Sequence, residues 1–215
     1  MSPTRIKICG ASRPEDARSA AYWGADAIGL VFHPSSARAV DIDTARAIVK
    51  ALPPFVTSVG LFLDAEPERV RATLEAVPLD ELQFHGIETP DYCRAFARPY
   101  VKAVGMGAGM GAGADVTAAA ANYPDARGIL VDSHAAGEAG GTGEAFGWER
   151  LPAQRAYGLI LAGGLSPENV AEAVTSVRPD AVDVSTGVER ARGVKDDDRI
   201  REFIEEVRRG DRNRA

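Results

Sequence analysis

Short apolar runs alternate with longer amphipathic stretches along this chain, and glycine or proline stands between most of them. Runs of four to seven residues rich in Val, Ile, Leu and Phe are typical of strands that are buried on both faces, as in a parallel sheet. We predict eight such strands, at residues 6–9, 27–32, 57–63, 81–84, 100–104, 128–132, 158–161 and 181–184.

The stretches between these runs show helical periodicity, and several open with a proline in the first turn, where its missing N–H group costs little. We predict helices at residues 14–23, 44–52, 67–76, 90–97, 167–177 and 198–208. Regular alternation of strands and helices indicates βα units and a parallel sheet. The pattern therefore predicts a (β/α)8 TIM barrel that forms a single domain over residues 1–215, with a doubly wound open sheet as the alternative.

Two glycine-rich regions break this rhythm. Residues 105–121 are almost entirely Gly and Ala, which indicates a mobile or weakly helical connection. Residues 133–147 carry no helical stripe, and strand and helix signals resume after them. We therefore interpret the second region as a long loop within the domain.

Composition and charge narrow the classes of function. A chain of 215 residues with 45% hydrophobic content and no long apolar run is typical of a soluble globular protein. The first residues show neither a secretory signal nor a transit peptide, so we expect a cytoplasmic protein in which Cys9 and Cys93 stay thiols. The net charge of −6 argues against broad binding to nucleic acid or to an anionic membrane. An anionic ligand would need locally placed cations.

Strand alternation brings polar residues into the barrel interior. The residues that share an inner face are Lys7 with Cys9, Gln83 with His85, and Asp183 with Ser185. Burying Lys7 or Asp183 alone would be costly, so we expect them to pair with each other or with a ligand. For Lys7, a purely structural ion pair is an equally good interpretation.

Two reactive groups follow apolar runs, Cys9 after the first and Asp132 at the end of the sixth. Active sites of this fold lie at the carboxyl ends of the strands, where both would stand. They suit a general base and a general acid that face one substrate. The structural alternatives are a small buried side chain for Cys9 and a turn cap for Asp132.

Glycine-bearing turns follow the seventh and eighth strands, AGGLSPEN at 162–169 and STGVE at 185–189. Glycines let backbone N–H groups approach an oxyanion, and this fold commonly holds phosphate at these two loops. A tight strand-to-helix turn uses the same residues, but the coincidence of both turns favours a phosphate site. The candidate phosphate contacts are Gly163, Gly164, Ser185, Thr186 and Gly187.

Several short segments together resemble one enzyme family. They are KICG at 7–10, GLVF at 29–32 with SARAV at 36–40, LQFHG at 82–86, VDS at 131–133, GGTG at 140–143, LAGGL at 161–165 with PENV at 167–170, and DVSTGVE at 183–189 with GVKD at 193–196. In this order, over nearly the whole chain, they resemble phosphoribosylanthranilate isomerase. The resemblance implies a TIM barrel that rearranges N-(5-phosphoribosyl)anthranilate in tryptophan biosynthesis without a cofactor or a metal.

The resemblance also implies roles for individual residues. Cys9 would be the general base, Asp132 the general acid, and Arg38 the contact for the anthranilate carboxylate, a task that suits a guanidinium group. An acid of this kind must keep its proton near neutral pH, and the thiol must spend part of its time as thiolate. We infer that Lys7 favours that thiolate. Weaker candidates, for substrate hydroxyls or for orienting neighbours, are Gln83, His85 and Asp183; His33 and His134 receive no role.

The chain departs from the family pattern at three positions, and three other functions compete with the isomerase hypothesis. The departures are Ala37 in place of a common proline, Gly147 in place of an aspartate, and Asp64 in place of an asparagine. The histidine-pathway isomerase, which resembles this family, uses an aspartate where this chain has Cys9. A barrel that only binds a sugar phosphate would need neither Cys9 nor Asp132. An aldolase would need a Schiff-base lysine near a strand end, whereas Lys7 and Lys102 lie inside their runs, which argues against that function. We expect a small-molecule substrate and a monomer or homodimer.

Overall fold

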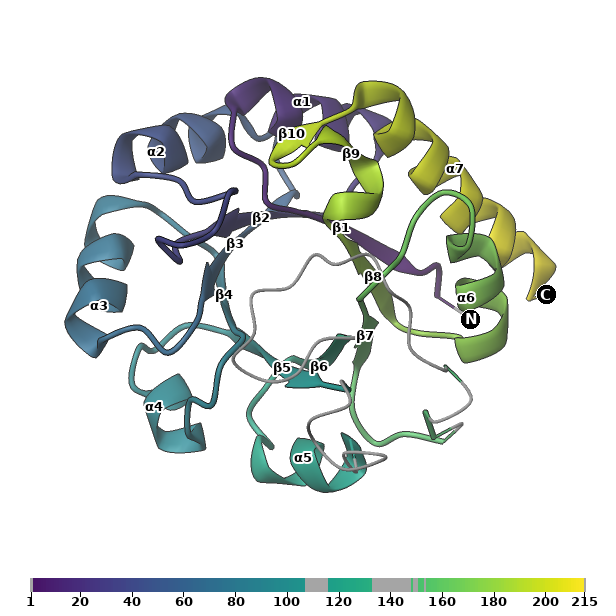
Figure 1. The fold of residues 1–215 in the computed structure, drawn as a ribbon. Helices are drawn as coiled ribbons and strands as arrows, with labels where there is room; N and C mark the ends of the chain where they lie inside the picture. The colour runs from purple at the N-terminus through teal and green to yellow at the C-terminus, as the bar shows by residue number, and fades with distance from the viewer. Residues whose placement is uncertain (1, 107–115, 133–147, 149–150, 153, 215) are drawn as a thin grey trace.

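The computed structural model describes residues 2–106, 116–132, 148, 151–152 and 154–214. Eight parallel strands form a closed barrel, in which each strand pairs with its sequence neighbours and β8 pairs with β1 (Figure 1). The strands are β1 (Arg5–Cys9), β2 (Ala27–Val31), β3 (Thr57–Phe62), β4 (Glu81–Phe84), β5 (Tyr100–Gly105), β6 (Gly128–Asp132), β7 (Leu159–Leu161) and β8 (Ala181–Val184). The predicted barrel is confirmed, and the alternative of an open sheet is wrong because β1 and β8 close the ring.

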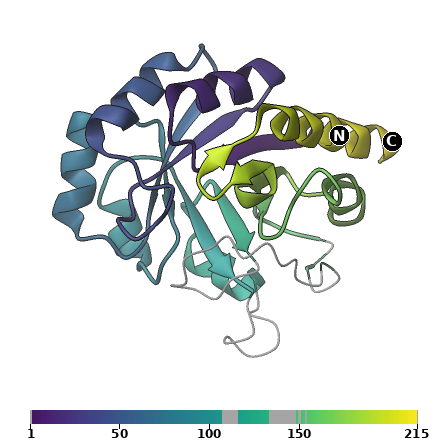
Figure 2. The same cartoon turned by 45° about the horizontal axis from the view of Figure 1, so that its top comes forward.

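Helices cover the outside of this ring (Figure 2). They are α1 (Pro14–Trp23), α2 (Ile42–Ala51), α3 (Pro67–Ala76), α4 (Pro90–Arg94), α5 (Val116–Asn122), α6 (Val170–Val177) and α7 (Asp197–Asn213). Proline begins α1, α3 and α4, and the Asp41 carboxylate caps α2 by accepting the Thr44 N–H at 2.7 Å. Among the described helices, none is long and apolar enough to cross a membrane.

Four helices differ from the predicted ranges, and one of them, α2, begins two residues earlier and ends one residue earlier than predicted. Helix α4 ends at Arg94, earlier than predicted, and α7 continues to Asn213, beyond the predicted end. Helix α6 begins only at Val170, because the Asn169 side chain holds the preceding residues in a turn. Its Oδ1 accepts the Ser166 N–H at 2.9 Å, and its Nδ2 donates to the Gly164 carbonyl at 2.8 Å.

The glycine-rich regions are described only in part. Helix α5 occupies the end of the region at 105–121, which agrees with the prediction of some helix there. Residues 107–115 of that region, and the whole predicted loop at 133–147, lie outside the described residues.

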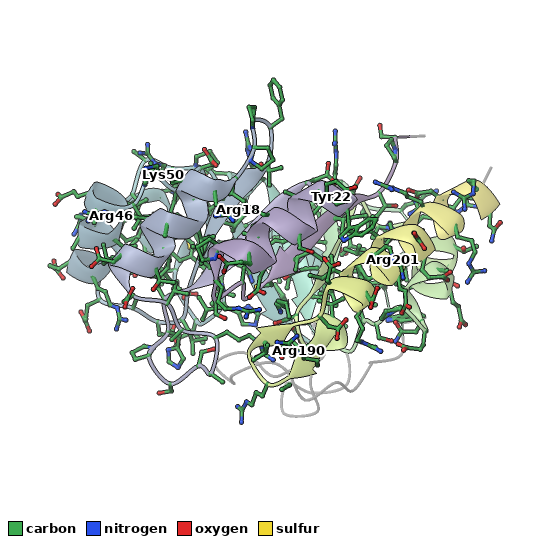
Figure 3. The ribbon with its side chains drawn as sticks, turned by 90° about the horizontal axis from the view of Figure 1, so that it is seen from above. Arg18, Tyr22, Arg46, Lys50, Arg190 and Arg201 are labelled. Atoms are coloured by element: carbon green, nitrogen blue, oxygen red, sulfur yellow. The ribbon has the colours of Figure 1, made fainter. Side chains whose placement is uncertain are left out.

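A small hairpin after β8 was not predicted. A single 3-10 turn at Thr186–Val188 leads into the antiparallel strands β9 (Glu189–Ala191) and β10 (Val194–Lys195). In Figure 3, Arg190 marks this hairpin at one end of the molecule, whereas Lys50 and Tyr22 lie toward the other end. The hairpin follows the carboxyl end of β8, so it stands at the end of the barrel where the candidate site is expected.

The apolar core lies mainly between the strands and the helices, where Phe62, Phe84 and Phe203 are fully buried. The barrel interior holds a second, small apolar cluster, which consists of Val101, Ala103, Leu130 and Ala162 with Ile160 beside it. The predicted inward-facing polar residues occupy the rest of that space, and Lys7, Gln83 and Asp183 are all buried. Polar groups therefore converge within an aliphatic wall, as the strand alternation predicted.

Candidate active site

The carboxyl ends of the strands surround a cavity of about 330 Å³. All the residues that the sequence suggested for the site line it; they are Cys9, Arg38, Gln83, His85, Asp132, Gly163, Gly164, Asp183, Ser185, Thr186 and Gly187. These side chains and turns come from six different strand ends and loops, so the closed barrel alone brings them together. Their placement in one cavity is observed, and their individual roles stay predictions.

Lys7 and Asp183 form an ion pair in the barrel interior. The register of β1 and β8 places them opposite each other, and Lys7 Nζ donates to Asp183 Oδ2 at 2.9 Å. The side chains are only 9% and 8% exposed. Burial lowers the pKa of Lys7, but Asp183 and Cys9 more than offset it, so the pKa is raised and the ammonium stays charged. The predicted pairing between the two residues is confirmed.

Cys9 ends β1 in a buried position close to this ion pair. Burial raises the pKa of its thiol above the ordinary value, and Lys7 opposes that shift by favouring the thiolate. The direction of the Lys7 effect agrees with the inference from the sequence. Burial nevertheless outweighs it, so the thiol is a weaker acid than a free cysteine. Gly29 of β2 lies opposite Cys9 in the strand register, and a Cβ there would come within 2.8 Å of Cys9 Sγ and 3.1 Å of Lys7 Nζ.

Gln83, His85 and Asp132 form a second polar group across the cavity. Gln83 Nε2 lies 3.1 Å from His85 Nδ1, and His85 Nε2 lies 3.9 Å from Asp132 Oδ2. Burial lowers the pKa of His85, although Asp132 works in the opposite direction, so the imidazole is neutral at pH 7. If the Gln83 amide donates to Nδ1, the ring proton sits on Nε2 and points toward Asp132. The geometry thus favours an orienting role for Gln83 and His85.

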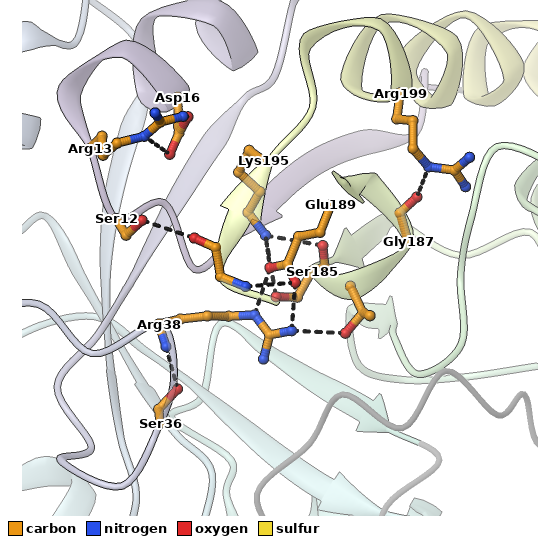
Figure 4. A network of polar contacts seen from close by, with 12 residues as sticks. Ser12, Arg13, Asp16, Ser36, Arg38, Ser185, Gly187, Glu189, Lys195 and Arg199 are labelled. Carbon is orange, nitrogen blue, oxygen red and sulfur yellow. Dashed lines mark hydrogen bonds and ion pairs between the residues drawn. The ribbon is translucent and has the colours of Figure 1, made fainter. Parts of the chain in front are cut away.

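Arg38 reaches the cavity from the loop after β2, and ionic contacts hold its guanidinium group (Figure 4). Its Nε donates to Glu189 Oε1 at 2.7 Å, and its Nη2 donates to Glu189 Oε2 at 2.9 Å. Lys195 Nζ donates to the same carboxylate at 2.9 Å. Glu189 and Lys195 were part of the quoted segments but received no role, because nothing in the local sequence links them to Arg38.

The two glycine-bearing turns lie against each other at the cavity wall. Gly163 and Gly164 have φ values of 79° and 66°, in the left-handed region that favours glycine. A Cβ on Gly187 would overlap the Leu165 carbonyl oxygen, so the turn after β8 packs directly on the turn after β7. Only glycine fits at that contact. This arrangement places the two turns on one side of the cavity.

Sequence reasoning missed some lining residues and left one alternative open. His33, Ser36 and Asn169 also line the cavity, whereas His134 lies outside the described residues. Lys102, the lysine weighed for an aldolase, is buried away from the cavity, where its Nζ donates to the Gly86 carbonyl at 2.6 Å. It is therefore a structural lysine. Within the described ranges, no cluster of His, Cys, Asp and Glu has the geometry of a metal site.

Comparison with known proteins agrees with this geometry. Residues 6–206 match the family model of N-(5'-phosphoribosyl)anthranilate (PRA) isomerase. This chain belongs to the PRA isomerase family. The N-(5'-phosphoribosyl)anthranilate isomerase of Halorhodospira halophila is 57% identical over 208 residues, which are 97% of this chain and 98% of the relative.

Solved PRA isomerases share the fold. The crystal structure of the Thermus thermophilus protein has a TM-score of 0.83 at 38% identity, and the match covers 95% of this chain and 98% of that one. A PRA isomerase in complex with reduced 1-(o-carboxyphenylamino)-1-deoxyribulose 5-phosphate has a TM-score of 0.78 at 38% identity, with the same two coverages.

Two of the three departures from the usual PRA isomerase pattern lie among the described residues. Asp64 has a φ of 44°, a conformation that Asp and Asn tolerate, and its Oδ1 accepts the Ile87 N–H at 2.7 Å. An asparagine side chain would offer the same acceptor. Beside Ala37, the Arg38 N–H is bound by Ser36 Oγ at 3.1 Å, which ties the loop locally. Gly147 is outside the described residues.

Proposed function

We propose that this chain catalyses the Amadori rearrangement of N-(5-phosphoribosyl)anthranilate to 1-(2-carboxyphenylamino)-1-deoxyribulose 5-phosphate in tryptophan biosynthesis. The observation that carries the proposal is the cavity itself, which Cys9 and Asp132 line together with a guanidinium group and two glycine-bearing turns. A product of this kind has a carboxylate at one end and a phosphate at the other. The cavity of this chain offers a partner for each end.

The two proton-transfer groups suit the chemistry of the rearrangement. Asp132 delivers a proton to the furanose ring oxygen as the ring opens, and Cys9 removes a proton from C2 of the resulting imine. The enol that forms gains a proton at C1 and loses the proton of its O2 hydroxyl to give the ketone, so no atoms are gained or lost overall and the reaction is an isomerisation. A neutral His85 with its proton on Nε2 faces Asp132 and stabilises the carboxylate that remains after proton delivery.

Two buried acceptors support a role in binding the opened sugar. Gln83 Oε1 and Asp183 Oδ1 are buried and have no hydrogen-bond partner among the described residues, and both side chains line the cavity. A buried acceptor without a donor costs free energy, so the site favours a ligand that supplies hydroxyl groups. The hydroxyls of the ribulose chain are such donors, which agrees with the weaker sequence prediction for both residues.

The test is steady-state turnover of freshly generated phosphoribosylanthranilate, followed by the loss of its anthranilate fluorescence. We expect turnover by the wild type and a loss of several orders of magnitude in Cys9→Ala and Asp132→Asn. Cys93→Ala is the matched control, because this thiol is fully buried outside the cavity. A wild type that binds the substrate without consuming it would leave only a phosphate-binding barrel. Turnover of the histidine-pathway aminoaldose substrate instead would assign the other isomerase activity.

We further infer a single cooperative domain in the cytoplasm, as a monomer or a homodimer. The closed barrel supports the single domain, because β1 and β8 depend on each other for pairing. One sharp unfolding transition at all probes would support it, and two separate transitions would contradict it. Sedimentation equilibrium distinguishes the monomer from the homodimer.

A further inference from the structure

The carboxylate of Glu189 is the centre of a buried ionic network in the cavity wall (Figure 4). Its side chain is only 2% exposed. It accepts four hydrogen bonds, and besides the two from Arg38 these come from Lys195 Nζ at 2.9 Å and from the Gly193 N–H at 3.1 Å. Four donors fill the acceptor positions of a carboxylate, so this group has no capacity left for a ligand.

The network determines which part of Arg38 meets the cavity. A guanidinium group has five N–H donors. Nε uses one on Glu189, and Nη2 uses two, on Glu189 and on Thr186 Oγ1 at 3.0 Å. The two remaining donors are on Nη1, which has no partner in the described part of the chain. Glu189 thus orients Arg38 so that Nη1 is available to an anionic ligand.

Backbone packing holds the stem of Arg38 in the same place. A Cβ on Gly10 would come within 2.5 Å of Arg38 Cδ, and one on Gly193 would come within 2.7 Å of the Ala37 carbonyl oxygen. Both glycines have positive φ values, of 76° and 80°. The loops after β1 and β2 and the β9–β10 hairpin therefore meet closely around this side chain.

The same network reaches the candidate phosphate turn. Lys195 Nζ also donates to the Ser185 carbonyl at 3.0 Å and to Ser185 Oγ at 3.3 Å. One carboxylate therefore joins the guanidinium group proposed for the anthranilate end to the turn proposed for the phosphate end. Without the negative charge of Glu189, two buried cations would face each other in the cavity wall.

We propose that Glu189 is a positioning residue for the isomerase reaction, acting on the substrate through Arg38 and not by direct contact. The proposal rests on the proposed function, because it takes the anthranilate carboxylate as the ligand of Arg38. Glu189 sets the direction of Nη1, and Lys195 transmits the same constraint to the turn at Ser185. A substrate with two anionic ends is then held at a fixed distance from Cys9 and Asp132.

The test is a double-mutant cycle between Glu189→Gln and Arg38→Met, read as KM and kcat for phosphoribosylanthranilate. Gln keeps the shape of Glu189 but turns an N–H₂ group toward cationic donors. We expect Glu189→Gln to lower kcat/KM roughly 10- to 100-fold, mainly through KM, because a misdirected Nη1 loses its hydrogen bonds to the charged carboxylate of the substrate. In the Arg38→Met background the same change should have almost no further effect. Glu206→Gln, which alters an exposed ion pair on α7, is the matched control.

An equal loss of kcat/KM in the wild-type and Arg38→Met backgrounds would overturn the proposal, because Glu189 would then act independently of Arg38. If Glu189→Gln does not fold, Glu189→Asp keeps the charge and shortens the reach, and the cycle is run with it. Binding of reduced 1-(o-carboxyphenylamino)-1-deoxyribulose 5-phosphate is measured in the same four proteins. A wild type without turnover would refute the proposed function, while non-additive binding would still support the action of Glu189 through Arg38.

Discussion

The absence of a side chain at Gly29 is the feature of the site that a single substitution tests most directly. Gly29 lies on the inner face of β2, opposite Cys9 in the strand register. A Cβ there would stand 2.8 Å from Cys9 Sγ, 3.1 Å from Cys9 Cα and 3.1 Å from Lys7 Nζ. All three distances are below ordinary van der Waals contact, so Gly29→Ala must displace Cys9, Lys7 or β2 itself.

The size of the effect follows from these distances. Carbon and sulfur atoms in contact need about 3.5–4.0 Å, so the thiol must move by about 1 Å. Overpacking of this kind lowers the free energy of unfolding by about 1–3 kcal/mol. A reacting group that is misplaced by 1 Å lowers the rate about 100-fold. We therefore expect Gly29→Ala to fold with reduced stability and to lose about 100-fold in kcat, with a small change in KM.

Gly60→Ala is the matched control, because Gly60 lies on β3 among the outward-facing residues. A Cβ there would stand 2.6 Å from Leu79 Cδ1 and 3.2 Å from Phe62 Cε2, both far ends of core side chains. We expect a loss of stability of the same order, measured by urea unfolding, with kcat unchanged. Gly29→Ala with wild-type kcat, or a kcat loss in Gly60→Ala as large as in Gly29→Ala, would refute the reasoning.

Other predictions concern charge and the two glycine-bearing turns. Lys7→Met removes the cation that lowers the pKa of Cys9, so the limb of the kcat/KM pH profile that reports the thiolate should move to higher pH. The same shift is expected in the double variant with Asp183→Asn, which removes the carboxylate that Lys7→Met leaves without its partner. An unchanged limb would exclude this role for Lys7. Gly187→Ala should weaken binding of inorganic phosphate, measured by calorimetry, because its Cβ overlaps a backbone carbonyl; unchanged affinity would place the phosphate elsewhere. Burial opposes the charge of Glu189, but its cationic partners outweigh burial, so its pKa lies below the ordinary 4.5. The stability that Glu189 gains from these contacts is therefore fully present above about pH 4.5 and is lost as the pH falls further. Between pH 7 and pH 3, the urea midpoint of Glu189→Gln should fall less than that of the wild type.

The eight strands were predictable because each needs two buried faces and therefore leaves a short apolar run in the sequence. Helix ends were less predictable. The start of α6 depends on a hydrogen bond of the Asn169 side chain, and an asparagine does not interrupt the helical pattern of the sequence. The β9–β10 hairpin left no signal, because strands of three and two residues have too few positions to show alternation.

The residues of the cavity were predictable where their position at the carboxyl end of a strand is enough to place them in the site. Cys9, Asp132 and the two glycine-bearing turns qualified on that ground, whereas Arg38 depended on the family resemblance. The ionic network was missed because Arg38 and Glu189 are separated by 151 residues, and only the closed barrel brings them together. The titration of Cys9 was equally out of reach, since it depends on burial outweighing the nearby cation Lys7.

Closure of the barrel by β1 and β8 also sets an order of events on the ribosome. Asp183, the ion-pair partner of Lys7, lies 176 residues downstream, and at typical elongation rates the synthesis of that stretch takes roughly 10–35 s. Throughout that interval the first strand has an unpaired edge, and the thiol of Cys9 is open to oxidants and alkylating agents. The nascent chain therefore exposes the residue proposed as its general base, and that exposure ends when the last strand pairs.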